Sequence, residues 1–413
     1  MTLAIALILL PLIILTLCFA IEILVGIRPL PQALTLAAQP ARTVIVVPAH
    51  NEQAILRERL SSLNEAAEGR ARVLVIADNC TDSTADIARD VGVEVIERID
   101  PSRRGKGFAL DFAKRHLQLD PPDLVLVIDA DCVTDSRSLD RLIAACASTG
   151  GPCQATNIQI PAQHSSPAVQ LSTFAFFIKN VIRQRALQRL SGRAQLLGTG
   201  MAFPWWIFVG AELATDDIVE DLKLGQQFAE QGNSPVFVEQ ARVLSNAETD
   251  RNTLSQRQRW EGGYLRTAFR LAPSLFARSL ARADWRGVWA AIDLMIPPIA
   301  LLVLADVIAL IAASVLAWVG HAHIWPLLLL SLALVLAAFA VALAWRAGGS
   351  EFITLGALAR APLYVLWKIP MYLRFARGGA PEEWVRTSRE GPTGEIARTA
   401  GRNRESARRK SKR

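Results

Sequence analysis

Five apolar residues, Leu124 to Ile128, lie directly before two acidic residues, Asp129 and Asp131. Because this run does not alternate with polar residues, it predicts a strand buried on both faces of a parallel sheet. Ligands of open α/β sheets bind beyond the carboxyl ends of such strands, and residues two apart on a strand point the same way. The two carboxylates therefore favour Mg²⁺ or Mn²⁺ bound to a substrate diphosphate. The alternative is a strand end closed by solvated acids.

The preceding segment has the alternating strand and helix pattern of a doubly wound α/β sheet. We expect strands at Thr43–Val47, Arg72–Ala77 and Val93–Glu97, a helix near Ser138–Ala147 and a further strand at Gln154–Ile160. The first two strands run into polar segments, Pro48–Glu52 and Asp78–Thr84. Polar residues at the carboxyl ends of neighbouring strands are what a nucleotide-binding edge requires.

Three further segments carry residues suited to phosphate or proton chemistry. Arg103–Gly107 combines fixed positive charge with flexible glycines, which suits diphosphate oxygens, although a solvated basic loop has the same composition. Gly198-Thr199-Gly200 forms a glycine-bearing turn. Glu220 and Asp221 stand at the head of a predicted helix, where the helix dipole stabilises acids whether or not they catalyse a reaction.

Long apolar runs predict membrane spans. Residues Thr2–Ile21 carry no charge, and two further runs, Leu294–Gly320 and Ile324–Trp345, are separated by a very short loop. Each is long enough to cross a bilayer, and the last two indicate a transmembrane hairpin. Asp306 lies inside the second run and should face other helices, because a carboxylate facing lipid is costly. The length of the first run and the lack of a preceding basic residue argue against a cleaved signal peptide.

The charge distribution indicates a cytoplasmic catalytic region. The net charge of the chain is +7, and the segment 386–413 alone has ten basic and three acidic residues. The rest is near neutral, which argues against a nucleic-acid partner, whereas a basic tail beside apolar spans favours a cytoplasmic end near anionic lipid. The five cysteines form no C-x-x-C pair, as expected in a reducing compartment. Ala168–Leu190 is amphipathic, and an interfacial helix or a helix packed on the sheet fits it equally.

In this order the motifs resemble those of a membrane-bound family 2 glycosyltransferase, a relative of the cellulose, chitin and hyaluronan synthases with the GT-A fold. The resemblance covers residues 43 to 275 and rests on seven segments in sequence: P-A-H-N-E, D-N-C-T-D, R-G-K-G, D-A-D, T-G-M, E-D and Q-R-Q-R-W. A single segment is weak, but seven in the family's order are specific. Val219 departs from the synthases, which have threonine there, so the acceptor is left open.

The resemblance implies roles for individual residues. Asp129 and Asp131 would hold the ribose and a divalent Mg or Mn cation, and Asp221 would be the general base that deprotonates the acceptor hydroxyl. Gln256, Arg259 and Trp260 would act on the diphosphate and the acceptor. The donor is expected to contact residues of the other segments: Pro48, Glu52, Asp78 (against the base), Lys106, Thr199, Gly200 and Glu220. These roles agree with in-line displacement at an anomeric carbon, which needs a base and positive charge on the leaving diphosphate.

Together these observations predict an inverting, metal-dependent glycosyltransferase of the cytoplasmic membrane. We expect a nucleotide diphosphate sugar, a UDP-sugar, as donor, and a lipid-linked or growing saccharide as acceptor in surface polysaccharide synthesis. The partners expected are membrane lipids and other polysaccharide-assembly proteins. A processive synthase is the alternative, although three spans are few for an export channel. A membrane sensor or scaffold that only binds nucleotide sugar is the alternative of another class; a complete set of catalytic motifs argues against it.

The predicted domain organisation follows the chain. Residues 1–27 form an N-terminal transmembrane helix with its start outside, and 43–275 form a cytoplasmic GT-A domain with interfacial helices. Residues 288–346 form the transmembrane hairpin, 351–376 an interfacial helix, and 386–413 a basic, disordered cytoplasmic tail. The fold expected for the catalytic domain is α/β, Rossmann-like, with a mostly parallel sheet.

Overall fold

The computed structural model describes residues 2–31, 41–215, 219–247, 250–320 and 323–377, apart from the side chains of residues 250–256. The tail predicted at 386–413 lies outside these residues. The chain divides into two compact units. We call residues 31–165 and 195–253 the sheet unit, and residues 1–30, 166–194 and 254–381 the helical unit.

The sheet unit is built on one mixed, mostly parallel sheet, which confirms the predicted fold class. Its strands in the described residues have the order β3-β2-β1-β4-β7-β6-β8-β5. They are β1 (Thr43–Ala49), β2 (Arg72–Asp78), β3 (Glu94–Arg98), β4 (Leu124–Val127), β5 (Val133–Thr134), β6 (Cys153–Ile160), β7 (Met201–Pro204) and β8 (Val236–Asn246). The first four in that order are parallel, whereas β7 is antiparallel to both its neighbours and β5 is antiparallel to β8.

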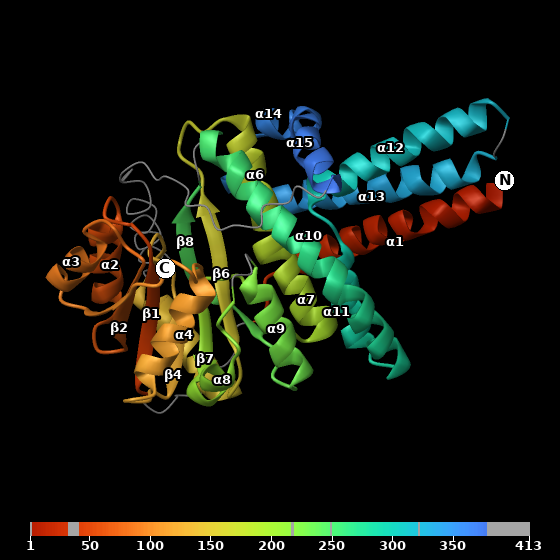
Figure 1. The fold of residues 1–413 in the computed structure, drawn as a ribbon. Helices are drawn as coiled ribbons and strands as arrows, with labels where there is room; N and C mark the ends of the chain where they lie inside the picture. The colour runs from red at the N-terminus through yellow and green to blue at the C-terminus, as the bar shows by residue number, and fades with distance from the viewer. Residues whose placement is uncertain (1, 32–40, 216–218, 248–249, 321–322, 378–413) are drawn as a thin grey trace, which may run out of the picture. The chain divides into compact units, whose positions relative to one another are not determined.

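Both faces of this sheet are covered, as the uniform apolar strands require. Alternate residues of β1 point to opposite faces, so that Ile45 and Val47 join one core and Val44 and Val46 the other. The first core is completed by α2 (Leu56–Ala67), α3 (Thr84–Asp90) and α5 (Ser136–Thr149). The second is completed by α4 (Lys106–Leu117), α8 (Trp205–Gly210) and α9 (Glu220–Glu230). Figure 1 labels β1 and these helices apart from α5.

Among the described residues, three helices are long and apolar enough to cross a membrane, and all three belong to the helical unit. They are α1 (Thr2–Gly26), α12 (Ile299–Trp318) and α13 (Trp325–Arg346), which run side by side (Figure 1). Asp306 of α12 is fully buried, and both its carboxylate oxygens lie 3.0–3.1 Å from the Thr16 hydroxyl of α1. This contact confirms that Asp306 faces another helix.

Further helices of the described residues complete this unit. They are α6 (Pro167–Phe177), the π-helical η1 (Ile178–Arg183), α7 (Gln184–Ser191), α10 (Asp250–Ala281), α11 (Trp285–Met295), the short η2 (Gly349–Glu351), α14 (Leu355–Leu358) and α15 (Ala361–Ala376). The helix predicted at Ala168–Leu190 therefore forms, with a π-helical turn in its middle. It contacts α1 and α11 within the helical unit.

A buried ion triad joins three segments of the helical unit. The Arg183 guanidinium of η1 donates to the Glu22 carboxylate of α1 at 2.6 Å and to the Asp293 carboxylate of α11 at 2.7 Å. All three side chains are at most 8% exposed. Arg183 is thus an internal cross-link of the helical unit.

Replacing Arg183 by Met is expected to lower the free energy of unfolding by about 3–5 kcal/mol, because two buried carboxylates lose their shared cation. Thermal and denaturant unfolding of the full chain in detergent measures this effect. Arg270→Met, an exposed arginine of α10, is the control and should change stability by less than about 0.5 kcal/mol. A loss as small as the control's for Arg183→Met would contradict the prediction.

Candidate active site

Three polar segments follow neighbouring parallel strands of the sheet unit. Pro48 of β1 pairs with Ile76 of β2, and Val46 of β1 pairs with Val127 of β4. These registers bring the ends of the three strands to the same edge of the sheet. The segments beginning at Pro48, Asp78 and Asp129 therefore share one edge, as the sequence predicted.

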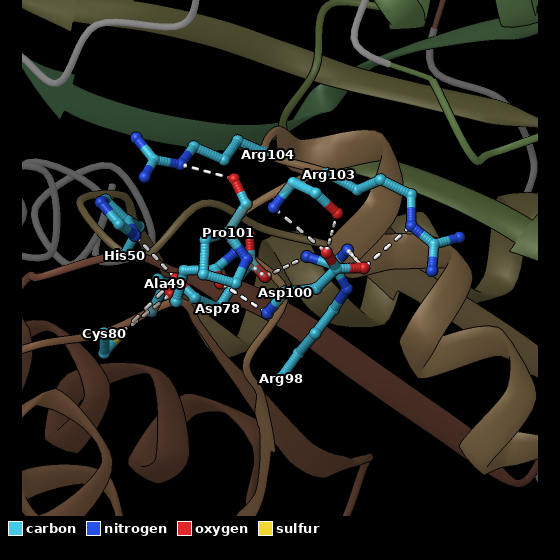
Figure 2. A network of polar contacts seen from close by, with 11 residues as sticks. Ala49, His50, Asp78, Cys80, Arg98, Asp100, Pro101, Arg103 and Arg104 are labelled. Atoms are coloured by element: carbon cyan, nitrogen blue, oxygen red, sulfur yellow. Dashed lines mark hydrogen bonds and ion pairs between the residues drawn. The ribbon is translucent and has the colours of Figure 1, made fainter.

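The Asp78 carboxylate is held at the end of β2 by an arginine that the sequence did not single out. Arg98, the last residue of β3, donates to Asp78 at 2.6 Å, and both side chains are about a tenth exposed. Arg98 also reaches Asp100, which accepts a bond from Arg103 at 2.8 Å (Figure 2). Burial raises the pKa of Asp78, and its bonds from Arg98 oppose that shift only in part. Arg103, expected at the diphosphate, is engaged in this network.

Two asparagines shape the loops beside Asp78. Asn51 and Asn79 adopt φ values of 54° and 51°, a left-handed conformation that asparagine tolerates better than most residues. Asn51 accepts a bond from the Thr81 amide, and Asn79 accepts one from the Asp100 amide, each at 2.7 Å. The loop after β1 is further fixed because the Glu52 amide donates to the Thr84 hydroxyl at 2.8 Å. The loop segments after β1 and β2 thus form one framework.

Lys106 is the centre of the second group of residues. It is the first residue of α4; its ammonium pairs with Asp129 and donates to the Gly198 carbonyl at 2.7 Å. Two different constraints require glycine on either side of Lys106. Gly105 adopts a φ of 129°, which strains any residue with a Cβ, and a Cβ on Gly107 would meet the Leu213 carbonyl. The segment R-G-K-G therefore places this lysine by backbone geometry.

Asp221 and Glu220, at the start of α9, lie beside Lys106. A Cβ built on Gly198 would stand 3.3 Å from an Asp221 carboxylate oxygen and 3.7 Å from the Lys106 nitrogen. Burial, and next the charge of Asp221, raises the pKa of Glu220 to about 8. Burial alone would lower the pKa of Lys106, but Asp129 and the two acids of α9 raise it above its usual value. The site thus gathers three carboxyl groups around one ammonium ion.

The turn Gly198–Gly200 connects this cluster to the end of β4. The Thr199 hydroxyl accepts a bond from the Asp129 amide at 3.0 Å, and the Gly200 amide donates to the Val127 carbonyl at 2.9 Å. Gln154, fully buried in β6, holds the same turn: its amide nitrogen donates to the Thr199 carbonyl, and its oxygen accepts from the Leu197 amide, both at 2.9 Å. Nothing in the sequence pattern marks Gln154, which sits among ordinary strand residues.

The residues at the end of β4 offer a donor set for a divalent cation. Asp129, Asp131 and Cys132 each present one possible ligand atom, and these atoms lie within 4.8 Å of one another. Burial, and next the charge of Asp131, raises the pKa of the Cys132 thiol well above its usual value. The two carboxylates are hard oxygen donors, which fit Mg²⁺ or Mn²⁺.

The segment Q-R-Q-R-W lies in α10, in the helical unit. The side chain of Gln256 is outside the described residues, while Arg259 and Trp260 are partly exposed. Arg257, which follows Gln256 and which the sequence pattern did not single out, is buried. It donates to the Ser172 carbonyl of α6 at 2.8 Å, and its guanidinium carbon lies 5.3 Å from the centre of the Trp260 ring. Asp217, an acid four residues before Asp221 that could serve as the base in its place, lies outside the described residues.

The family described as "Glycosyltransferase like family 2" matches residues 40–263, more than half of the chain. The chain belongs to this family of glycosyltransferases. The match covers every segment on which the resemblance was based. The chain is accordingly a family 2 glycosyltransferase that uses nucleotide sugars, as predicted.

Two known proteins show how far the likeness extends. The uncharacterized protein MJ1222 of Methanocaldococcus jannaschii is 31% identical over 99 residues, which are 24% of this chain and 39% of that relative's length. The solved mannosyltransferase PcManGT from Pyrobaculum calidifontis, in complex with GDP-Man and Mn²⁺, has a TM-score of 0.53 and 18% identity. That comparison covers 89% of this chain and 99% of that one, and shows a shared fold.

In this glycosyltransferase the sheet unit brings together most of the predicted site residues. Lys106, Asp129, Thr199 and Asp221 are within one network of contacts, with Glu220 beside them. Asp78 and Glu52 belong to the neighbouring framework of loops. Arg98 and Gln154 are two residues that the motifs did not mark, because each contacts a partner 20 or more residues away in the sequence.

Proposed function

We propose that this glycosyltransferase moves a sugar, with inversion, from a UDP-sugar to a lipid-linked or growing saccharide in surface polysaccharide synthesis. The observation that supports this best is the Asp221 carboxylate beside Lys106, which is itself paired with Asp129 at a strand end. A base and a fixed positive charge are the two groups that in-line displacement of a nucleoside diphosphate needs.

The proposed reaction has one displacement step. The acceptor hydroxyl oxygen attacks the anomeric carbon and gives its proton to an Asp221 oxygen. The new carbon–oxygen bond forms as the bond from that carbon to the diphosphate breaks, and the diphosphate leaves with the electron pair. Lys106 compensates the charge of the leaving group, and Arg259 pairs with its oxygens through the planar guanidinium. Trp260 and Gln256 are assigned to the acceptor and the diphosphate.

A divalent cation is the proposed cofactor, held by Asp129 and Asp131. When bound it supplies Lewis-acid charge to the leaving diphosphate. The similar mannosyltransferase was solved with Mn²⁺ and GDP-Man, which supports a metal and adds guanine to the bases to be tested. Asp78, which Arg98 and Asn79 hold, is proposed to contact the base.

Two other functions are tested against this one. A processive synthase would build long products, and a sensor or scaffold would bind nucleotide sugar without turnover. Purified full-length protein in lipid nanodiscs, given UDP- or GDP-sugars and lipid-linked acceptors, is expected to release nucleoside diphosphate only when acceptor is present. Release that does not depend on any acceptor, or none at all despite donor binding, would contradict the proposal. Mass spectrometry of lipid-linked oligosaccharides in cells lacking the protein then identifies the acceptor.

The three apolar helices associate the chain with a membrane. We further propose that the segments 1–27 and 288–346 cross the cytoplasmic membrane, that 351–376 is interfacial, and that the catalytic region 43–275 is in the cytoplasm. The basic tail at 386–413 supports this orientation.

Cysteine labelling tests the orientation. Val319→Cys, between α12 and α13, should react with a membrane-impermeant maleimide in intact cells. Arg115→Cys, an exposed position of α4, should react only after lysis. The parent protein is the blank, since four of its five cysteines are buried. Labelling of Arg115→Cys in intact cells would reverse the assignment.

A further inference from the structure

Helix α15 has its polar and apolar sides the opposite way round from a helix in water. Its buried face carries Tyr364, Lys368, Met371 and Tyr372, at helical spacing. Its exposed face carries Leu363, Leu366, Trp367 and Leu373, which are 39–65% exposed. A buried lysine beneath a leucine-rich surface is unfavourable in water but suits a helix whose outer side meets acyl chains.

The buried face of α15 holds one carboxylate of α10. The Lys368 ammonium pairs with one oxygen of Glu261, and the Tyr372 hydroxyl donates to the other at 2.9 Å. The Lys368 and Glu261 side chains are 3% and 13% exposed. The Lys368 nitrogen also lies 5.0 Å from the centre of the Tyr364 ring. Both oxygens of Glu261 are therefore bound from α15.

A second helix holds the same turn of α10. The Arg257 guanidinium donates to the hydroxyl and the carbonyl of Ser172 in α6, and lies 5.5 Å from the Phe176 ring. The Trp260 ring stands 5.9 Å from Phe176. The turn 257–261 is thus held by α6 and by α15, two helices that also contact each other.

Helix geometry connects this arrangement to the Q-x-x-R-W residues. Arg257 and Glu261 are four residues apart and lie on one side of α10. Arg259 is two residues from each, which on a helix of about 3.6 residues per turn places it on roughly the opposite side. Fixing Arg257 and Glu261 therefore fixes the rotation of α10 and the direction in which Arg259 points.

We propose that α15 is a lipid-facing positioning helix, in which Lys368 and Tyr372 hold Glu261 and thereby set the orientation of Arg259 and Trp260. This inference rests on the proposed function, in which Arg259 and Trp260 act on the substrate. Glu261, Lys368 and Tyr372 are positioning residues, because each acts through the helix turn that it holds. Burying the Lys368–Glu261 charge pair costs desolvation free energy. Its role in this proposal is therefore to fix the rotation of α10 rather than to add stability.

The test uses the full chain in lipid nanodiscs. Lys368→Met leaves the Glu261 carboxylate without its cation, and kcat is expected to fall about a hundredfold, the size of effect that a small misplacement of reacting groups produces. The donor KM should change much less than kcat, because the donor-binding residues of the sheet unit are unchanged and Arg259 is assigned to the diphosphate as it leaves. Tyr372→Phe removes one hydrogen bond and should lower kcat about three- to tenfold. Arg374→Met, an exposed basic residue of the same helix, is the matched control and should have no effect.

A second substitution that restores kcat distinguishes a positioning role of Lys368 from a general loss of folding. Glu261→Gln combined with Lys368→Met removes both charges, and should raise kcat at least about tenfold above Lys368→Met alone. If Lys368→Met keeps kcat within about threefold of the parent, or the double variant stays as low as the single one while binding donor normally, the proposal is wrong. Should Lys368→Met fail to fold, Tyr372→Phe decides: parental kcat would overturn the proposal.

Two further measurements complete the test. A fluorophore on Leu366→Cys should be quenched by brominated lipids, whereas one on Arg115→Cys should not; no quenching at Leu366 would overturn the lipid-facing assignment. Asp221→Asn and Trp260→Ala report on the proposed function separately. If both abolish transfer while the Lys368 variants do not, only the positioning role fails; if both retain transfer, the proposed function fails.

Discussion

Replacing Asp221 by Asn is expected to slow sugar transfer by about a hundred- to ten-thousand-fold, the usual cost of removing a general base. Asparagine keeps the size of the side chain and most of its hydrogen bonding, but has no basic oxygen. Donor affinity should hardly change, since Asp221 has no role until an acceptor hydroxyl arrives. Calorimetry with the donor and a transfer assay on the same purified protein measure the two effects.

The alternative role of Asp221 makes a different forecast. If it only stabilises the start of α9 through the helix dipole, asparagine should serve nearly as well, with little loss of activity. Glu230→Gln, at the other end of α9, is the control for charge removal on this helix and should leave transfer unchanged. If transfer by Asp221→Asn stays within about threefold of the parent, the base is another residue, and Glu220 or Asp217 is the next to test.

The parts of this fold that local patterns determine could be predicted. The uniform apolar runs of β1, β2 and β4, each followed by polar residues, are local signals, and the strands begin within one residue of the expected positions. The residues placed at their ends therefore share one edge of the sheet. The sequence predicts the glycines beside Lys106 as flexible residues. In the structure Gly105 adopts a φ that strains other residues, and Gly107 lies too close to a backbone carbonyl to carry a Cβ.

The contacts that could not be predicted join residues far apart in sequence. Arg183 pairs with Glu22 across 161 positions, and Lys368 pairs with Glu261 across 107. A charged residue in an apolar segment signals only that it needs a partner, and many acids in the chain could provide one. The segment 351–376, which contains Lys368, is predicted to lie at a membrane interface. The structure places the Lys368 ammonium inside the helical unit. Which pair forms is decided by the packing of whole helices, not by local sequence.

Removal of divalent cations is expected to abolish transfer, with a loss of at least about a hundredfold, because metal charge on a leaving diphosphate is worth several kcal/mol. The physical reason lies at the end of β4, where a diphosphate and the carboxylates of Asp129 and Asp131 would repel one another. Lys106 cannot offset this charge alone, since it is surrounded by Asp129, Glu220 and Asp221. Asp131→Asn should weaken both Mn²⁺ and donor binding, as measured by electron paramagnetic resonance and calorimetry.

Asp135→Asn is the matched control for that experiment. Asp135 is four residues after Asp131 and directly follows β5, but its carboxylate accepts a bond from the Ser138 amide at 2.7 Å and caps α5. Asparagine caps a helix equally well, so this variant should bind Mn²⁺ and transfer sugar as the parent does. Full activity in excess chelator would show that Lys106 and Arg259 carry the charge of the leaving group without a metal. In that case Lys106→Met, rather than Asp131→Asn, should be the variant that loses transfer.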